Sequence, residues 1–489
     1  MSEGQREATR DARFAVIGAG MAGILSGIKL LEAGHSDFSI YEKADRLGGT
    51  WRENTYPGIA CDVPSHLYSY SFRPNPDWSH RFSPGDEIQA YFEGVAREYG
   101  VYERIRFGEQ VTRCEFRDGR WQLETAGGLR DEVDFVIAAT GVLHVPNYPD
   151  FEGLDSFLGD VFHSARWDHD VVLKGRRVGV VGTGSTAVQI VSASVAEVEQ
   201  LSLFQRTPQW IMPQDNPPYT DAEQAEFRRP GALRELHDDL SRLFAEGFSN
   251  AVVDADSPQM KLIGEMCLAN LEDNVRDSEL RERLRPNYRA ACKRLVVSPD
   301  FYAAIQQPNA ELVTEGIERV EAKGVRTRDG RLHELDVLVL ATGFRADAFM
   351  RPMQVIGRGG VGLDDIWKPR PIAYLSISMP GFPNFFMLNG PNGPVGNFSL
   401  IEIAELQFDY ILQLVDLVRS GRCREVSPTP VAMRDFDVAR VEAAKNTVWT
   451  TGCRSWYLDD RGIPATWPWT FDRFRDEMEH PQLEAYELA

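Results

Sequence analysis

The chain has 489 residues, and its 73 Asp and Glu against 53 Lys and Arg give a net charge of -20 at pH 7. This negative charge opposes nonspecific binding to nucleic acid or to an anionic membrane, so neither partner is expected. Hydrophobic residues at 43% and charged residues at 26% are typical of a soluble globular enzyme. The length predicts two or three domains.

The cellular location is predicted from the N-terminus and the cysteines. Residues 1–13 are polar and charged, unlike a signal peptide, and no apolar run reaches the roughly 18 residues of a membrane span. The cysteines are scattered, without a C-x-x-C pair or metal-type spacing, which suits a reducing cytoplasm. We therefore expect a cytoplasmic protein with no metal site and no redox-active dithiol. The six are Cys61, Cys114, Cys267, Cys292, Cys423 and Cys453.

Residues 14–42 and 178–206 follow the same pattern. Each segment begins with a short apolar run, passes through a glycine turn, continues as an apolar-periodic helix and ends in a second strand. This βαβ pattern predicts an α/β protein with two Rossmann-like dinucleotide-binding domains.

The first glycine turn has the sequence G-x-G-x-x-G directly after a strand. Its first glycine makes the turn, its second admits a pyrophosphate, and its third packs the helix on the strand. Glu42 follows the first glycine by 24 residues, where a carboxylate can bind ribose hydroxyls. The site suits a dinucleotide without a 2′-phosphate. The glycines are Gly18, Gly20 and Gly23.

The second glycine turn is a G-x-G-x-x-A variant with opposite charge. Arg206 stands at the position that corresponds to Glu42, and Thr207 follows it. A guanidinium pairs with a 2′-phosphate, whereas a carboxylate repels it, so this site suits NADP. The alternative is that Arg206 is an ordinary surface arginine. The turn and the helix start consist of Gly182, Gly184, Ser185 and Ala187.

Two dinucleotide sites in one chain are explained by hydride transfer from NADPH to a bound FAD. The two ATG tripeptides, at 139–141 and 341–343, then mark the points where the chain passes between domains.

Elsewhere we expect a helix after an N-cap at Ser83, a Gly-, Pro- and Asn-rich loop at 381–397 and a helix at 399–419. The predicted parts are an FAD domain at 1–145 and 345–489, an NADP domain at 146–216 and 290–344, and a mostly helical insert at 217–289.

Two longer motifs stand out: the first comprises Phe157, Gly159, His163, Trp167 and Asp168, and the second comprises Gly48, Gly49, Trp51, Tyr56, Pro57, Gly58 and Asp62. Both resemble motifs of the type I Baeyer-Villiger monooxygenases, and the resemblance spans nearly the whole chain. Related N- and S-hydroxylating flavin monooxygenases usually end the first motif in Phe or Tyr, so Trp167 favours the Baeyer-Villiger group. Without the family, His163 is read as an interdomain hydrogen-bonding residue and Trp167 as a core aromatic.

The resemblance also implies roles for individual residues. Lys293 would join Arg206 at the 2′-phosphate, and Arg294 would lie against the flavin and nicotinamide as the catalytic cation. Asp62 would hold Arg294 in position, and Trp456 would close over the nicotinamide. In the family the His163 motif couples domain movement to catalysis, so no proton transfer is assigned to it. Gly49 and Trp51 would belong to the FAD site.

The implied reaction inserts one atom of O2 into a small ketone, through a C4a-peroxyflavin, to give an ester or lactone, and extends to sulfides. The main alternative is an N- or S-hydroxylating flavin monooxygenase. A disulfide reductase would need a cysteine pair near the flavin, which the spacing does not offer. A non-catalytic flavoprotein that senses redox state is the remaining class. Both a monomer and a homo-oligomer are compatible with the sequence.

Overall fold

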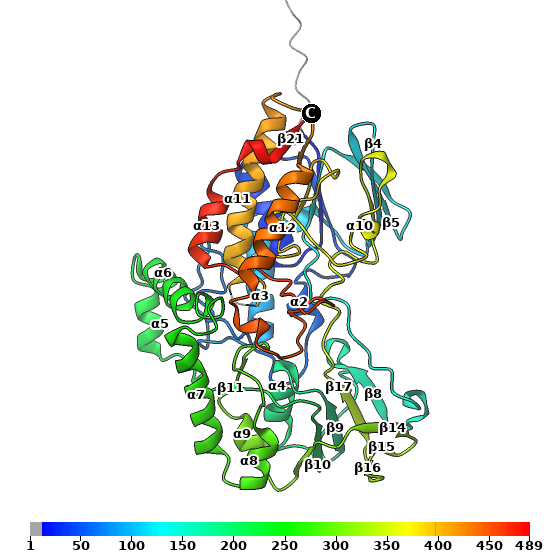
Figure 1. Ribbon diagram of the computed structural model, residues 1–489, viewed down its shortest axis with the longest axis vertical. Helices are drawn as coiled ribbons and strands as arrows, with labels where there is room; N and C mark the ends of the chain where they lie inside the picture. Colours follow the sequence, from blue (N-terminus) through cyan, green and yellow to red (C-terminus); the bar gives the residue numbers. More distant parts are fainter. Residues whose placement is uncertain (1–11, 397) are drawn as a thin grey trace, which may run out of the picture.

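In the computed structural model the chain forms two halves, each built around its own sheet, with a group of helices along one side (Figure 1). The structure describes residues 12–396 and 398–489. Residues 1–11, which make up most of the polar N-terminal segment considered above, lie outside the described part. We call the half that contains strand β1 (Phe14–Ile17) the upper half and the one that contains β9 (Arg177–Val181) the lower half, as they lie in Figure 1.

The upper half contains a five-stranded parallel sheet in the order β19-β7-β1-β2-β3. Its central strands are buried along their whole length, as expected for a sheet covered on both faces. The order reverses at β1, and such switch points bind ligands in doubly wound sheets. The other strands are β2 (Phe38–Tyr41), β3 (Ile105–Arg106), β7 (Phe135–Ala138) and β19 (Phe385–Met387).

The lower half repeats this sheet in the order β13-β10-β9-β17-β8, again all parallel. Each strand has a counterpart at the same place in the upper sheet. Four strands of each sheet also follow in the same chain order (β1, β2, β3, β7 and β9, β10, β13, β17), whereas β8 precedes the other strands of its sheet and β19 follows those of the upper sheet. The prediction of two Rossmann-like domains is confirmed. The remaining strands here are β8 (Asp160–His163), β10 (Gln200–Phe204), β13 (Ala310–Val313) and β17 (Val337–Leu340).

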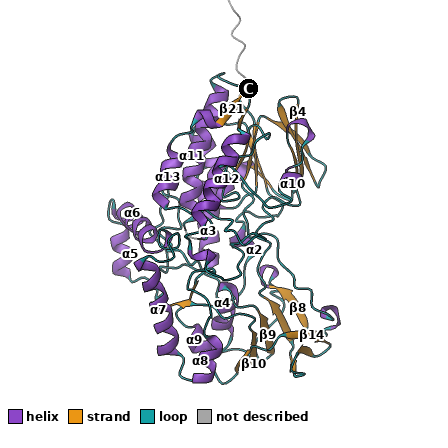
Figure 2. Ribbon diagram, viewed as in Figure 1, coloured by secondary structure: helices purple, strands orange, loops and turns teal. Residues whose placement is uncertain are grey.

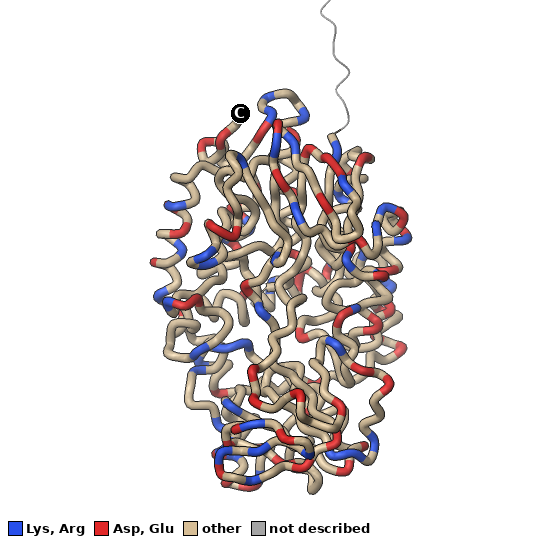
Figure 3. Tube along the Cα trace, turned by 90° about the vertical axis from the view of Figure 1, so that its right-hand side faces the viewer, with Lys and Arg blue, Asp and Glu red and all other residues tan. Residues whose placement is uncertain are grey.

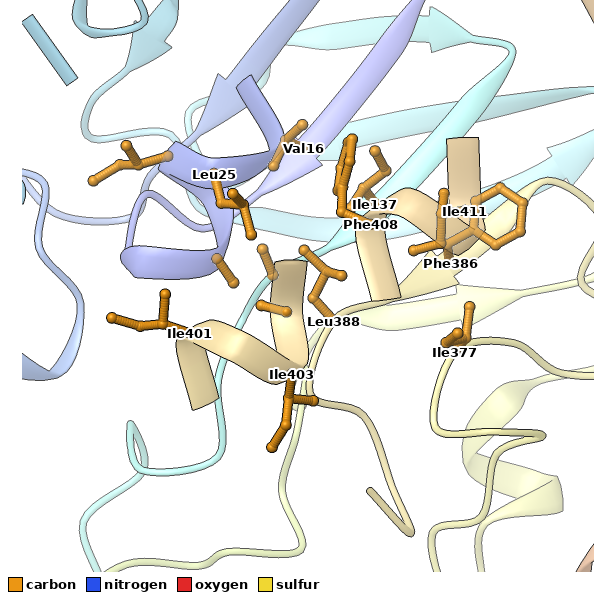
Figure 4. Close-up of a cluster of buried hydrophobic side chains, with 14 of the residues drawn as sticks. Val16, Leu25, Ile137, Ile377, Phe386, Leu388, Ile401, Ile403, Phe408 and Ile411 are labelled. Atoms are coloured by element: carbon orange, nitrogen blue, oxygen red, sulfur yellow. The ribbon is translucent and has the colours of Figure 1, made fainter. Parts of the chain in front are cut away.

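The core of the upper half lies between the sheet and two helices, α1 (Met21–Glu32) and α11 (Leu400–Arg419) (Figure 4). Val16 and Ile137 of the sheet are fully buried together with Phe408 of α11. Burying a side chain of this size stabilises the fold by roughly 1.5–3 kcal/mol. The C-terminal part of the chain is therefore needed to complete the N-terminal sheet.

The chain crosses between the halves twice, directly after the two ATG tripeptides. After β7 it runs to β8 of the lower sheet, and after β17 it returns to the upper half. The two linkers run side by side: the Asn147 amide donates to the Gly343 carbonyl at 2.9 Å, and the Arg345 amide donates to the Val145 carbonyl at 2.9 Å. The predicted crossover points are confirmed.

The predicted insert is mostly helical, and it contacts both halves (Figure 2). The Ser241 hydroxyl donates to Glu402 of α11 at 2.6 Å, which ties the insert to the upper half. Asn270 donates to the Ile211 carbonyl at 3.0 Å, which ties it to the lower half. Its helices are α5 (Asp221–Phe227), α6 (Ala232–Phe244), a π-helical turn (Ala245–Ser249), α7 (Pro258–Asn274) and α8 (Ser278–Leu284).

Smaller elements complete the two halves. No helix of the described residues is both long enough and apolar enough to cross a membrane. Basic and acidic residues are interspersed along the chain (Figure 3). The other helices are α2 (Thr50–Glu53), α3 (Gly85–Glu98), α4 (Ser185–Ser194), α9 (Phe301–Ile305), α10 (Leu363–Ile366), α12 (Pro430–Ala444) and α13 (Phe471–Glu479). The other strands are β4 (Val111–Arg117), β5 (Arg120–Thr125), β6 (Arg130–Val133), β11 (Ile211–Met212), β12 (Val296–Val297), β14 (Ile317–Glu321), β15 (Gly324–Thr327), β16 (Leu332–Glu334), β18 (Gln354–Ile356), β20 (Val426–Pro428) and β21 (Tyr486–Leu488).

Two local predictions were wrong. Helix α3 begins at Gly85 with Pro84 as its N-cap, so Ser83 does not cap it. The Ser83 hydroxyl is instead buried and donates to the His80 carbonyl at 3.2 Å. The predicted loop at 381–397 contains β19, which pairs with β7 at the edge of the upper sheet. A three-residue strand between glycines and prolines has too short a pattern to be recognised.

The scattered cysteines include one bonded pair that their spacing did not predict. Cys292 and Cys453 form a disulfide across a sequence separation of 161 residues. Both are buried, in one apolar cluster with Trp449 and Tyr457. The other four are free and buried, namely Cys61, Cys114, Cys267 and Cys423.

The third glycine of the first turn provides a test of the fold. A Cβ on Gly23 would lie 1.8 Å from the Gly18 carbonyl oxygen, so Gly23→Ala forces α1 away from β1. We expect a loss of stability of about 1–3 kcal/mol. Gly94→Ala is the matched control: Gly94 is exposed inside α3 with no atom near its Cβ position, and alanine there should stabilise by about 0.5–1 kcal/mol. Thermal unfolding of both variants checks this, and equal midpoints would contradict it.

Candidate functional site

The first glycine turn leaves backbone amides free at the start of α1. Gly18 has φ +102°, a backbone angle that residues with a side chain rarely adopt. A Cβ added at this position would lie 2.6 Å from the Ala139 carbonyl oxygen. Gly20 is the N-cap of α1 and offers no side-chain cap, so the helix N-terminus keeps unpaired N–H groups and a positive dipole. A Cβ on Gly20 would be 3.4 Å from the Cα of Gly49. A helix start with free donors and no side chain in the way could hold a pyrophosphate.

Glu42 follows β2 and is only 4% exposed. Its carboxylate accepts hydrogen bonds from the Ala19 amide at 2.8 Å and the Ala44 amide at 3.0 Å, and it pairs with Arg52 at 2.8 Å. A carboxylate has about four acceptor positions, so one remains for a ribose hydroxyl. Sequence reasoning did not single out Arg52, although it follows Trp51 inside the second motif.

The second motif links the first glycine turn to the lower half. The Gly48 amide donates to the Ala19 carbonyl at 2.9 Å, while further along the Tyr56 hydroxyl donates to Gln189 of α4 at 3.0 Å. Gly58 has φ +78°, and its Cβ would lie 2.8 Å from the Gln189 carbonyl oxygen. The motif thus needs glycine where it touches α4.

Trp51, predicted at the FAD site, is buried in the core of the upper half. Its indole N–H donates to the Tyr68 hydroxyl at 3.2 Å. The ring therefore belongs to the apolar core of the upper half, where it meets the Tyr68 ring edge-to-face.

The second glycine turn has the same construction as the first. Gly182 has φ +124°, and its Cβ would lie 2.2 Å from the Ala341 carbonyl oxygen, as Gly18 stands to Ala139. Gly184 is the N-cap of α4 without a side-chain cap, Ser185 begins the helix, and Ala187 is fully buried. The N-terminus of α4 is accordingly free to bind a second pyrophosphate.

Two cations lie close together beyond this turn. Arg206 is exposed, and Lys293 lies near enough that burial and the Arg206 charge both lower the pKa of its ammonium. Lys293 also contacts the face of the Tyr288 ring at 4.7 Å. Among residues 12–396 and 398–489 neither cation forms an ion pair. Thr207 is tied into the turn, because the Thr183 hydroxyl donates to its carbonyl at 2.7 Å. Two neighbouring cations without an acidic partner favour the binding of an anionic ligand.

Arg294, the next residue, bridges segments from both halves. Its guanidinium donates to one Asp62 carboxylate oxygen at 2.6 and 3.2 Å and to the Gly396 carbonyl at 2.5 Å. Burial lowers the pKa of Arg294, but Asp62 and Tyr457 outweigh this and hold that pKa above its usual value. The side chains of Arg294 and Asp62 remain 32% and 25% exposed. The site therefore holds a fixed, permanently charged cation that a ligand can still reach.

The first motif lies at the interdomain linkers. His163 is fully buried; its Nε2 lies 3.1 Å from the Gly343 carbonyl oxygen, and its Nδ1 accepts from the Ala165 amide at 3.1 Å. Burial lowers the pKa of His163, so the ring is neutral at pH 7. A Cβ on Gly159 would lie 2.3 Å from the Asp336 carbonyl oxygen.

The aromatic members of this motif pack in the lower half. Phe157 is buried, and the Trp167 ring meets the Phe162 ring edge-to-face at 4.9 Å. Asp168 is exposed and accepts from the Asp170 amide at 3.0 Å. The aromatic rings therefore pack within the lower half, whereas His163 binds the linker carbonyl of Gly343.

Two further surfaces border the site. Trp456 is 46% exposed, and its ring lies tilted against that of Tyr457 with 4.2 Å between ring centroids. An open cavity of about 520 Å³ lies where the upper half meets the first motif. Its lining includes Lys43, Ala44, Arg52, Glu53, Arg166 and Trp167.

Sequence comparisons identify known proteins that are similar to this chain. The flavin-binding monooxygenase-like family model matches residues 11–219. An uncharacterized monooxygenase of Mycobacterium tuberculosis is 49% identical over 97% of this chain and 95% of its own length. A Baeyer-Villiger monooxygenase of Streptomyces coelicolor is 40% identical over 97% of this chain and 92% of its own length.

Solved structures extend the likeness to the whole fold. Cyclohexanone monooxygenase from Rhodococcus sp. Phi1, solved with NADP+ bound, superimposes with a TM-score of 0.87. The two are 30% identical, and the alignment covers 98% of this chain and 99% of the other. The chain belongs to the Baeyer-Villiger monooxygenase family of flavin-dependent enzymes.

Proposed function

We propose that this enzyme binds FAD and NADPH and inserts one atom of O2 into a small ketone, giving an ester or lactone. The observation that carries the proposal is the ion pair between Arg294 and Asp62, a residue of the upper half. Arg294 directly follows Lys293, which lies next to Arg206 in the lower half. We assign residues 1–145 and 345–489 to the FAD domain, 146–216 and 290–344 to the NADP domain, and 217–289 to the insert.

FAD belongs in the upper half. The uncapped N-terminus of α1 would bind the pyrophosphate, and Glu42 would accept from the ribose hydroxyls. A 2′-phosphate would meet the Glu42 carboxylate, so this site disfavours NADP. The open cavity beside Ala44 and Arg52 leaves room at the adenosine end.

NADPH belongs in the lower half. Its pyrophosphate would lie at the uncapped start of α4, beside Gly184 and Ser185. Its 2′-phosphate would relieve the repulsion between Arg206 and Lys293, with Thr207 alongside. Trp456 would close over the nicotinamide side.

Arg294 supplies the charge stabilisation. The reduced flavin, once bound, supplies the activation of O2. Negative charge then develops on oxygen next to the substrate carbonyl, and a guanidinium already fixed by Asp62 stabilises it without having to reorient. Asp62 acts through Arg294 by fixing its direction.

The reaction class can be measured directly. NADPH oxidation is followed with and without a cyclic ketone and an organic sulfide, and products are separated by chromatography. We expect the ketone to yield a lactone with NADPH consumed in proportion. Sulfoxide or N-oxide without lactone would instead indicate a heteroatom-oxygenating enzyme, and no substrate-dependent NADPH use would refute both.

Arg206 should determine the choice between NADPH and NADH. Arg206→Ala removes one charge-assisted hydrogen bond to the 2′-phosphate, so NADPH binding should weaken by about 1.5–3 kcal/mol, or roughly 10- to 100-fold. NADH lacks this phosphate and should be nearly unaffected. The matched control is Arg276→Ala, an exposed arginine of the insert. Steady-state KM values for both coenzymes check this, and equal losses for the two would contradict it.

Arg294 should be required for oxygen transfer to the substrate. Arg294→Ala should leave FAD bound but reduce lactone formation by about 100- to 1000-fold, the cost of losing a transition-state donor. Asp62→Asn should reduce lactone formation less than Arg294→Ala does, because Arg294 keeps its charge and loses only the carboxylate that orients its guanidinium. Arg177→Ala, which breaks a surface pair with Asp336, is the control. Stopped-flow absorbance separates flavin reduction from oxygen transfer; an Arg294→Ala enzyme that forms lactone at the unmodified rate would overturn the assignment.

A further inference from the structure

The Arg294 guanidinium has a second anchor on the opposite side from Asp62. The Gly396 carbonyl accepts from Arg294 at 2.5 Å and from the Tyr457 hydroxyl at 3.4 Å. One carbonyl oxygen is therefore shared by the proposed catalytic cation and a tyrosine of the C-terminal loop. Tyr457 is 3% exposed, so its hydroxyl is held inside the protein.

Gly396 shows how closely this hydroxyl is packed. Its φ of +94° favours glycine, and a Cβ there would lie 2.2 Å from the Tyr457 hydroxyl oxygen. The hydroxyl thus occupies the space that a side chain at 396 would fill. Any residue other than glycine would displace either Tyr457 or the carbonyl that Arg294 binds.

The loop that carries Tyr457 is fixed to the segment that carries Arg294. The disulfide joins Cys453, four residues before Tyr457, to Cys292, two residues before Arg294. The Tyr457 ring also packs against Trp449, with 5.6 Å between ring centroids. A covalent bond and an aromatic contact therefore set the position of the hydroxyl relative to the guanidinium.

We propose that Tyr457 is a positioning residue for Arg294, and that the Cys292–Cys453 disulfide holds its loop in place. The inference rests on the proposed function, because Arg294 is the catalytic cation there. Asp62 fixes one edge of the guanidinium and Tyr457, through Gly396, fixes the other.

A chemical probe tests the positioning without any turnover. Phenylglyoxal modifies arginine side chains, and peptide mass spectrometry of the FAD-loaded enzyme measures its rate at Arg294. Tyr457→Phe should raise this rate about fivefold, the equivalent of one hydrogen bond. Tyr302→Phe is the control, because that buried hydroxyl has no hydrogen-bond partner in the described structure. An unchanged rate at Arg294 in Tyr457→Phe would overturn the proposal.

Kinetics provides a second readout. Tyr457→Phe should lower kcat for lactone about fivefold with little change in the KM for NADPH, and a larger share of NADPH should end as hydrogen peroxide. In an Arg294→Lys background the same substitution should have little further effect, because residues that act through one group are not additive. Additive losses would refute the positioning role. Absence of lactone from the unmodified enzyme, with faster labelling in Tyr457→Phe, would refute the proposed function alone.

The disulfide is tested separately. A dithiol reductant breaks the S–S bond, leaves two cysteine thiols and is itself oxidised to a disulfide. Reduction of the unmodified enzyme, or Cys453→Ser, should accelerate labelling of Arg294 as Tyr457→Phe does. Cys267→Ser, at a buried free cysteine, is the control. If alkylation and mass spectrometry find the cysteines unpaired, or if cleavage leaves the labelling rate unchanged, the disulfide has no such role.

Discussion

The ion pair between Asp62 and Arg294 is the constraint around which the site is arranged. Its two residues are 232 positions apart and belong to different halves, so the pair exists only when both sheets have formed and docked. A partly buried guanidinium needs a carboxylate, because removing one partner leaves the other charge desolvated and unpaired. The segment leading to Asp62 needs glycine at 58 to approach α4. Docking of the halves and formation of the cation site are therefore one event.

The two dinucleotide sites share a fold but differ in how their charges are held. Glu42 is almost fully buried and accepts from two backbone amides, so it is part of its turn even before a ligand binds. Arg206 is exposed, lies next to Lys293 and forms no ion pair with any residue that the structure describes. A built-in carboxylate suits a cofactor that stays, whereas two mutually repelling cations gain most from an anion that binds and leaves. This difference fits a retained flavin and an exchanging coenzyme.

The sequence was informative where a residue has a local steric reason. Glycines at 18, 23 and 182 are each required by a backbone oxygen within 2.6 Å of the missing Cβ, which is why the fingerprints identified both turns. Long-range pairs have no such local pattern. The disulfide spans 161 residues, and neither cysteine has a partner at a recognisable spacing. The place of Asp62 against Arg294 came from the family resemblance, and Tyr457 had no signal apart from its position next to Trp456.

His163 of the first motif connects the two linkers between the halves. His163 binds the Gly343 carbonyl at the point where the two linkers run side by side, so it holds the crossing without belonging to either glycine turn. A neutral ring can accept from the Ala165 amide and donate to Gly343 at once, whereas a protonated ring could not accept. Burial favours that neutral form. The histidine is therefore suited to holding the relative angle of the two halves, and a change in that angle would move Arg294 relative to Asp62.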